Sequence, residues 1–279
     1  MKGMILVTGA TGNAGSAVAH ALVEAGEPVR GLVRAGSEAA LPDSVEPAVG
    51  DLNDADSVAP ALDGVSGVFM LSGYAGLERT LADARAAGVE RVVLLSNAAA
   101  PSGDTSNAVT RYHIESEAAV RESGLDWTFL QPRTFMTNAL QWAPQIRAGD
   151  VVRAPFGGVR VATIDPADIG AVAAAALTGE GHAGKAYPLT GPESLLPGER
   201  VAILGEVLGR DLRFEAQSDE EARAEMGKAM PPEYVDAFMA FFAEGTLDES
   251  EVLPTVEEVT GRPPRSFREW ATEHADAFR

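Results

Sequence analysis

Residues 4–15 read MILVTGATGNAG, and this stretch decides the fold of the whole chain. Its first four residues, Met4–Val7, are apolar, as in a strand that is buried on both faces of a sheet. A turn with glycines at positions 9, 12 and 15 follows. Beyond the turn, apolar residues recur at helical spacing at Val18, Ala21, Leu22 and Ala25. A strand, a glycine-rich turn and a helix in this order are typical of a site that binds the pyrophosphate of a dinucleotide.

Each glycine of this turn has a physical role in such a site. Gly9 permits a tight turn, Gly12 lets the backbone approach a pyrophosphate, and Gly15 lets the helix pack close to the strand. The N–H groups at the start of the helix then face the phosphates. The spacing is GxxGxxG rather than GxGxxG, and a plain strand–helix turn is the alternative. The position of the motif at the first strand–helix junction favours dinucleotide binding.

The same alternation of apolar runs and helical stretches continues to residue 132. Further strands are predicted at Val29–Val33, Val45–Val49, Val68–Leu71, Val92–Leu95 and Thr128–Leu130. Helical stretches lie between them, and Gly26, Gly88 and Gly124 follow three of these stretches, where a left-handed cap favours glycine. The pattern predicts an α/β fold, a Rossmann-type doubly wound parallel sheet with helices on both faces.

After Pro132 the alternation breaks. Thr134–Trp142 is predicted as a short helix, and Asp165 as the N-cap of an alanine-rich helix. Further strands are expected at 159–164, 185–189 and 212–216. We therefore expect a nucleotide-binding core over residues 1–132, completed by segments within about 159–192. Residues 133–158 and 193–279 are expected to form a smaller, mostly helical substrate-binding lobe.

The end of the second strand indicates which cofactor is bound. It reads Leu32-Val33-Arg34, and no carboxylate follows before Glu38. An NAD site usually has an Asp or Glu here, whereas Arg34 would pair with the 2′-phosphate of NADP. The alternative is that Arg34 is an ordinary solvated arginine. We expect NADP(H) to be favoured over NAD(H).

Composition excludes several other functions. The chain of 279 residues has 22 basic and 41 acidic residues, and the net charge of −19 disfavours nucleic acid and anionic membranes. Residues 211–279 carry 17 acidic and 7 basic side chains, which suggests a neutral or cationic substrate. There is no cysteine, which fits the reducing cytoplasm. The four histidines have no metal-ligand spacing, so no metal site is expected.

Four segments of the chain carry a resemblance to a known family. They are ILVTGATGNAG at 5–15, Gly50-Asp51-Leu52, the stretch from Tyr112 through Pro132 to Asn138, and residues 164–169 with 187–192. In these segments the sequence resembles the NmrA-like, atypical short-chain dehydrogenase/reductase family. Within that family it is similar to the quinone and triphenylmethane dye reductases. The likeness extends to about residue 215.

The glycine-rich turn and the resemblance together imply cofactor contacts at the carboxyl ends of the strands. The turn would hold the pyrophosphate, Arg34 the 2′-phosphate, and the later segments the adenine, the ribose and the nicotinamide. The expected cofactor-binding residues are Thr8, Gly9, Thr11, Gly12, Asn13, Ala14, Gly15, Arg34, Asp51, Leu52, Leu71, Ser72, Gly73, Ser96, Asn97, Ala98, Gln131, Pro132 and Phe135.

The expected catalytic residues are Tyr112 and His113. Short-chain dehydrogenases commonly use Tyr-x-x-x-Lys, but the residue four after Tyr112 is Ser116. His113 stands where family members often have His or Lys, and it would supply a proton or bind the ribose. A purely structural role for His113 is the alternative. A second departure is Gln131, where many members have Arg.

An aromatic cluster after residue 231 contains Phe238, Met239, Phe241 and Phe242. It would either pack the lobe against the core or form a lid over a hydrophobic pocket. The expected pocket residues are Tyr74, Met136, Phe156 and Phe238. We expect an NADPH-dependent reductase of a small hydrophobic carbonyl, quinone or conjugated substrate, acting as a monomer or homodimer. The alternative is a non-catalytic redox sensor that binds NAD(P) and regulates a partner.

Overall fold

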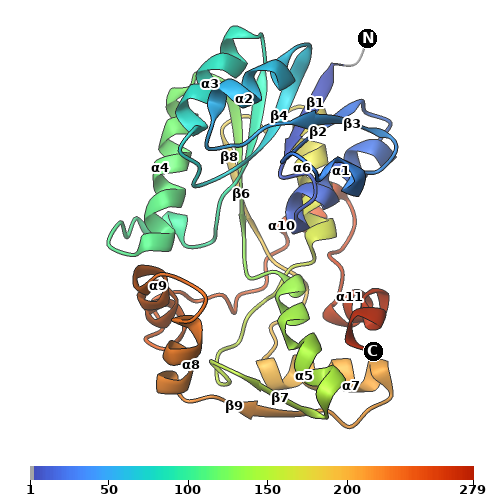
Figure 1. Cartoon of the computed structure of the whole chain (residues 1–279), viewed down its shortest axis with the longest axis vertical. Coiled ribbons are helices and arrows are strands. Elements are labelled where there is room, and N and C mark those ends of the chain that lie inside the picture. Colours follow the sequence, from blue (N-terminus) through green and yellow to red (C-terminus); the bar gives the residue numbers. More distant parts are fainter. Residues whose placement is uncertain (1–2) are drawn as a thin grey trace.

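A computed structural model describes residues 3–279, and its centre is a seven-stranded parallel sheet (Figure 1). The strand order is β3-β2-β1-β4-β5-β6-β8, the doubly wound Rossmann order extended by one strand. This confirms the predicted fold class. The strands are β1 (Met4–Thr8), β2 (Val29–Val33), β3 (Val45–Val49), β4 (Val65–Leu71), β5 (Arg91–Leu95), β6 (Asp126–Pro132) and β8 (Lys185–Leu189).

Helices cover both faces of the sheet because the strands are apolar on both sides. One face is covered by α1 (Asn13–Glu24), α6 (Pro166–Thr178) and α10 (Thr255–Thr260). The other is covered by α2 (Ala55–Val58), α3 (Leu77–Ala86) and α4 (Ala108–Glu122). Helices α1 and α6 approach closely, since a Cβ atom on Gly170 would lie 2.5 Å from the Ala17 carbonyl oxygen.

The predicted helix boundaries have the expected chemistry. Asp165 is the N-cap of α6, where its carboxylate accepts a hydrogen bond of 2.9 Å from the Ala167 N–H. Gly26, Gly88 and Gly124 have φ angles of 72°, 87° and 74°, in the region where only glycine is unstrained. These three positions therefore end their helices as predicted.

The second part of the molecule is built on a two-stranded parallel sheet of β7 (Val151–Ala154) and β9 (Arg213–Ala216). Trp142, Ile146, Phe267 and Trp270 are buried in its own core. We call this part the lobe (Figure 1, lower half). Its helices are α5 (Ala143–Ala148), α7 (Pro197–Leu208), α8 (Asp219–Met226), α9 (Pro232–Phe242) and α11 (Phe267–Glu273). Short 3-10 helices lie at Glu38–Ala40, Ala59–Leu62, Ala100–Ser102, Met136–Trp142 and Ala275–Phe278.

Three expectations for the second half of the chain are corrected. Residues 159–164 form no strand; they cross between the two parts and make single bridges, Phe135 with Ile164 and Val161 with Leu195. The predicted helix at 134–142 is a 3-10 helix. Helix α10 leaves the lobe and packs on α6 and β8, with Val256 fully buried in the main core, so residues 193–279 do not all belong to the lobe.

No helix within residues 3–279 is both long enough and apolar enough to span a bilayer.

Candidate active site

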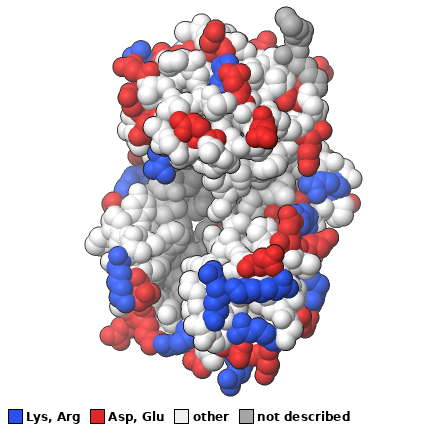
Figure 2. All heavy atoms as spheres, turned by 45° about the vertical axis from the view of Figure 1, so that its right-hand side comes forward, with Lys and Arg blue, Asp and Glu red and all other residues white. Residues whose placement is uncertain are grey.

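A cavity of about 1400 Å³ lies between the carboxyl ends of the strands and the lobe. The surface is hollowed at this junction (Figure 2). Leu71, Ser96 and Pro132 line it from the strand ends, and Phe156 and Phe238 line it from the lobe. Open parallel sheets bind ligands at this edge, where the strand order reverses between β1 and β4. The cavity is therefore the candidate active site.

The glycine-rich turn has the geometry that a pyrophosphate requires. Gly9 has a φ of 60°, and the N–H of Gly12 donates to its carbonyl oxygen at 2.8 Å. A Cβ atom on Gly15 would lie 2.1 Å from the same oxygen, so only glycine lets α1 approach β1 this closely. The N-cap of helix α1 is Gly12, which has no side chain to cap the helix, and this leaves the first N–H groups of α1 open to an anion. These residues fit a dinucleotide phosphate.

The two arginines of the second strand differ in their surroundings. Arg30 is engaged, because it donates to the Glu46 carboxylate and to the carbonyl oxygens of Ala61 and Asp63, each at 2.8 Å. Arg34 is exposed at the carboxyl end of β2 and takes part in none of the ion pairs found among residues 3–279. Of the two, Arg34 has the guanidinium that is open to a ligand.

Ser116, at the position where a Tyr-x-x-x-Lys motif has lysine, forms a link between elements. Its hydroxyl donates to the Tyr112 carbonyl oxygen at 2.7 Å and accepts from the Gly73 N–H at 3.0 Å. The Tyr112 ring packs on Gly73, where a Cβ atom would lie 2.9 Å from the ring. The serine thus holds Tyr112 and the loop after β4 together, without supplying a charge.

A buried network behind the cavity was missed by the sequence analysis. The Glu117 side chain is 6% exposed and accepts hydrogen bonds from Ser96 Oγ (2.6 Å), Gln131 Nε2 (2.9 Å) and Arg121 (2.9 Å). Arg121 in turn lies over the Phe129 ring. The network fixes Ser96 and Gln131 at the ends of β5 and β6. Its signal in the sequence was a carboxylate on the buried face of α4, on the same side as His113.

Burial changes the acid–base properties of the two expected catalytic residues in opposite directions. It raises the pKa of Tyr112 to about 12 and lowers the pKa of His113 to about 4. Their rings are 4.2 Å apart between centroids. A pKa this low favours the uncharged imidazole at neutral pH, which fits a hydrogen bond to the ribose, the second of the two expected roles of His113, better than the supply of a proton. Tyr112 keeps its proton and lines the cavity.

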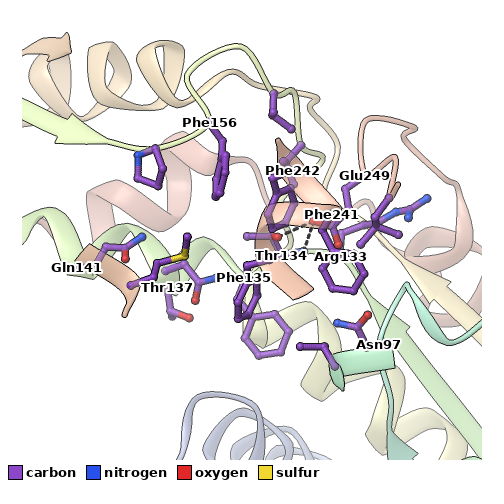
Figure 3. A pocket seen from close by; sticks show the side chains of 18 of the residues that line it. Asn97, Arg133, Thr134, Phe135, Thr137, Gln141, Phe156, Phe241, Phe242 and Glu249 are labelled. Atoms are coloured by element: carbon purple, nitrogen blue, oxygen red, sulfur yellow. Dashed lines mark hydrogen bonds between the residues drawn. The ribbon is translucent and has the colours of Figure 1, made fainter. Parts of the chain in front are cut away.

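Aromatic rings form the lobe wall of the cavity (Figure 3). Phe242 lies 5.3 Å from Phe156 and stacks on Phe238 at 6.5 Å between centroids. Phe156 has a φ of 58°, an unusual conformation for a bulky residue, and its ring contacts that of Phe242. The Asn107 Nδ2 group donates to the Ala237 carbonyl oxygen at 3.1 Å, which ties α9 to α4. The aromatic cluster therefore both packs the lobe and lines the cavity.

Two charged side chains at the lobe end of the cavity were also missed. Glu249 is 3% exposed, and Thr134 donates to its carboxylate from Oγ1 at 2.5 Å (Figure 3). Burial raises the pKa of Glu249. Arg200 is 7% exposed and lies over the Trp142 ring at 5.3 Å. Neither residue belongs to a sequence motif. Their burial depends on contacts between segments that are distant in sequence, so the sequence did not predict it.

The structure brings most of the expected residues to one edge of the sheet, but not all of them into the cavity. Met136 is corrected, because its side chain is 1% exposed and packs in the lobe core. The Gln131 side chain donates a hydrogen bond to Glu117 and so belongs to the buried network behind the cavity. The expected residues that line the cavity are Leu71, Ser72, Tyr74, Ser96, Asn97, Tyr112, His113, Pro132, Phe135, Phe156 and Phe238. Those outside its lining are Thr8, Gly9, Thr11, Gly12, Asn13, Ala14, Gly15, Arg34, Asp51, Leu52, Gly73, Ala98, Gln131 and Met136.

A Rossmann sheet with an open glycine-rich turn, next to a cavity closed by a second lobe, is the architecture of a nicotinamide-dependent oxidoreductase. The chain belongs to the NmrA-like family, which matches residues 1–271. It is 46% identical to the (4-alkanoyl-5-oxo-2,5-dihydrofuran-3-yl)methyl phosphate reductase of Streptomyces griseus, over 99% of both chains. It is 39% identical to the NAD(P)H azoreductase of Xenophilus azovorans, again over 99% of both.

Among solved structures, the fold is similar to that of an NADPH-dependent quinone oxidoreductase from Escherichia coli in complex with NADPH. The TM-score is 0.79 at 24% identity, over 97% of this chain and 99% of the other. These comparisons confirm the family resemblance. They also favour the predicted reductase over the predicted regulator, so the protein is an oxidoreductase that uses a nicotinamide cofactor.

Proposed function

We propose that the protein reduces a small conjugated or carbonyl substrate with NADPH. The observation that carries this proposal is the continuous cavity, which joins the strand ends at Ser96, Asn97 and Pro132 to the aromatic wall of the lobe. The bound cofactor supplies the hydride. The chain supplies an apolar, partly enclosed space in which a flat substrate can stack between Phe135 and the rings of the lobe.

The preference for NADPH over NADH rests on Arg34. Its exposed guanidinium at the end of β2 has no ion-pair partner in the described chain, and it would pair with the 2′-phosphate. The glycine-rich turn, from Gly9 to Gly15, would hold the pyrophosphate through its backbone N–H groups.

The expected hydrogen-bond donor to the substrate is Tyr112. Its phenol is protonated at neutral pH, since burial raises a pKa whose ordinary value is already 10, and its side chain lines the cavity. It would donate a hydrogen bond to the carbonyl oxygen that gains charge as hydride arrives. No lysine lies between Lys2 and Lys185, so this phenol acts without a neighbouring ammonium group.

The substrate class is supported by the relatives. The Streptomyces enzyme is named for a phosphate ester whose dihydrofuran ring carries oxo and alkanoyl groups, and the Xenophilus enzyme for azo compounds. Both names describe flat, conjugated acceptors. We therefore place unsaturated lactones, quinones and azo compounds first among candidate substrates.

Oxidation of NADPH at 340 nm, measured against these three classes, tests the proposal. We expect turnover with at least one class, and we expect Tyr112→Phe to lower kcat about tenfold or more, with the Kd for NADPH changed little. Tight NADPH binding without turnover on any class would contradict the proposal. The cytoplasm and a monomer or homodimer remain predictions, and light scattering checks the second.

A further inference from the structure

We propose that Arg133, directly after β6, and Arg200, on α7 of the lobe, form an anion-binding subsite in the cavity, which holds a phosphate group on the substrate. This inference rests on the proposed function, because it concerns the substrate of the same site. It replaces the neutral or cationic substrate that the acidic C-terminal segment suggested, since local side chains decide what a cavity binds.

The first step is to account for the charged side chains that line the cavity. They are Arg133, Arg153, Arg200, Glu225 and Glu249. Arg153 pairs with Glu221 at 3.0 Å, and Glu225 pairs with Lys228 at 2.5 Å. Glu249 accepts two hydrogen bonds from Thr134. Arg133 and Arg200 remain, and within residues 3–279 no acceptor bonds to either guanidinium.

An unpaired arginine in such a place is costly unless a ligand pairs with it. Arg200 is 7% exposed, and its Nε is buried without a hydrogen-bond partner. The Nε of Arg133 is buried in the same way. Burial lowers the pKa of Arg200 only to about 10, so the guanidinium stays charged at neutral pH. Buried charges of proteins are almost always paired, and a bound anion would satisfy both groups.

Glu249 lies near both arginines, since each of them counteracts the rise in the pKa of its carboxyl. Both arginines also line the same cavity. The Glu249 carboxylate is hydrogen-bonded to Thr134, and among the described residues no ion pair joins it to either arginine, so both guanidinium groups are available to the anion of a stronger acid. A phosphate ester is such an acid, and guanidinium groups bind its oxygens in a bidentate manner.

Other donors point to the same chemistry. Thr137 and Trp142 line the cavity, and the Oγ1 and Nε1 atoms of their side chains are buried without a partner among the described residues. The guanidinium group of Arg200 also lies over the face of the Trp142 ring. Indole and guanidinium groups only donate hydrogen bonds, so a ligand that binds them would do so through acceptor atoms.

The test uses three matched unsaturated lactones, which carry a hydroxymethyl group, its phosphate ester or a carboxymethyl group. For each, kcat/KM is measured by NADPH oxidation, and Kd by calorimetry on the enzyme saturated with NADP⁺. We expect the phosphate ester to be preferred over the alcohol by at least tenfold. Arg200→Gln and Arg133→Gln should each reduce this preference about tenfold or more.

Arg160→Gln is the matched control. Arg160 lies on the segment that crosses between the two parts; its side chain is 48% exposed, pairs with Glu199 and does not line the cavity. This variant should keep the wild-type preference. If Arg200→Gln does not fold, Arg133→Gln and the wild-type preference decide the question.

Equal preference for the alcohol and the phosphate ester in the wild type would overturn the subsite, as would a preference that both variants retain. A preference for the carboxymethyl lactone over the phosphate ester would overturn the choice of phosphate. Failure of the proposed function is recognised separately. In that case none of the substrate classes causes NADPH to be oxidised, while the Kd values from calorimetry still test the subsite.

Discussion

Tyr112 and His113 are adjacent on α4, yet burial acts on them with opposite consequences. Burial raises the pKa of the phenol and lowers the pKa of the imidazole, because a low-dielectric environment disfavours the charged form of each. The Nδ1 atom of His113 is buried without a partner in the described chain. At the residue scale, this position suits hydrogen bonding to a ligand better than proton supply.

His113 makes stability depend on pH in a defined direction. Its pKa falls from 6.5 in the unfolded chain to about 4 in the folded one, so the unfolded state binds more protons in this range. As the pH decreases from 6.5 to 4, this residue should cost on the order of 3 kcal/mol of stability. In His113→Gln that loss should disappear, as measured by urea unfolding at several pH values.

His20→Gln is the control for this measurement, because His20 is exposed on α1. Its stability should follow the wild-type pH profile. An unchanged pH dependence in His113→Gln would show that the histidine is not buried in its neutral form.

Arg34 carries the prediction for cofactor choice. Arg34→Gln should weaken NADPH binding about tenfold or more, because a charge-assisted hydrogen bond to a phosphate is lost, while NADH binding stays near its wild-type value. Fluorescence titration with both cofactors measures the two affinities. Arg147→Gln removes the same charge from an exposed site on α5 and should leave the ratio unchanged. If NADH already binds the wild type as tightly as NADPH, the role assigned to Arg34 is wrong.

At the scale of elements, the contact of β1 with α1 depends on the absence of one side chain. A Cβ atom on Gly15 would lie 2.1 Å from the Gly9 carbonyl oxygen and 2.9 Å from that of Thr8, and neither backbone atom can rotate away. The helix would therefore have to move off the strand. That movement would displace the N–H groups at the start of α1 from the pyrophosphate position.

Gly15→Ala should lower the free energy of unfolding by about 3 kcal/mol, as overpacking of a tight contact does, and weaken NADPH binding at least tenfold. Calorimetric melting and cofactor titration measure the two effects. Gly149→Ala is the matched control, because Gly149 has an extended φ of 179° and a Cβ atom added there would meet no heavy atom within 4 Å. Equal melting temperatures for both variants would contradict the role of Gly15.

At the scale of the whole molecule, the C-terminal segment is anchored to the main core by an acidic residue of α6. Asp168 is fully buried, accepts a hydrogen bond of 2.7 Å from the Arg265 N–H and lies 3.4 Å from the Arg262 guanidinium. Burial outweighs these partners and raises its pKa to about 6. This anchor joins the sheet to the segment that continues into α11 of the lobe.

The sign of the Asp168 effect is opposite to that of His113. The folded state here binds a proton more tightly than the unfolded state, whose pKa is 3.8, so stability from this group falls as the pH increases from about 4 to 6. Asp168→Asn should therefore gain stability relative to the wild type over this range, by on the order of 3 kcal/mol. Urea unfolding of both proteins between pH 4 and 7 checks this, and a constant difference would contradict it.

The lobe also shows how charge is arranged over the whole surface. In Figure 2 basic side chains gather beside acidic ones in the lower half, and several acidic residues of the lobe are paired, such as Asp150 with Arg210 and Glu206 with Arg268. The net charge of −19 thus describes the whole chain rather than any one site.

The sequence by itself determined the parallel sheet, its helices and the glycine-rich turn. Alternating apolar runs and glycines at 9, 12 and 15 are local patterns, and local backbone geometry follows from them. Residues 159–164, which read VRVATI, were assigned wrongly because a short stretch rich in β-branched residues can cross between two parts as well as pair in a sheet.

Only the tertiary structure decided the chemistry of the cavity. The Glu117 network, the neutral state of His113, the burial of Met136 and the unpaired Arg200 all depend on which distant segments meet. Desolvation and hydrogen-bond pairing are set by those neighbours, and neither is encoded in the spacing of residues along the chain.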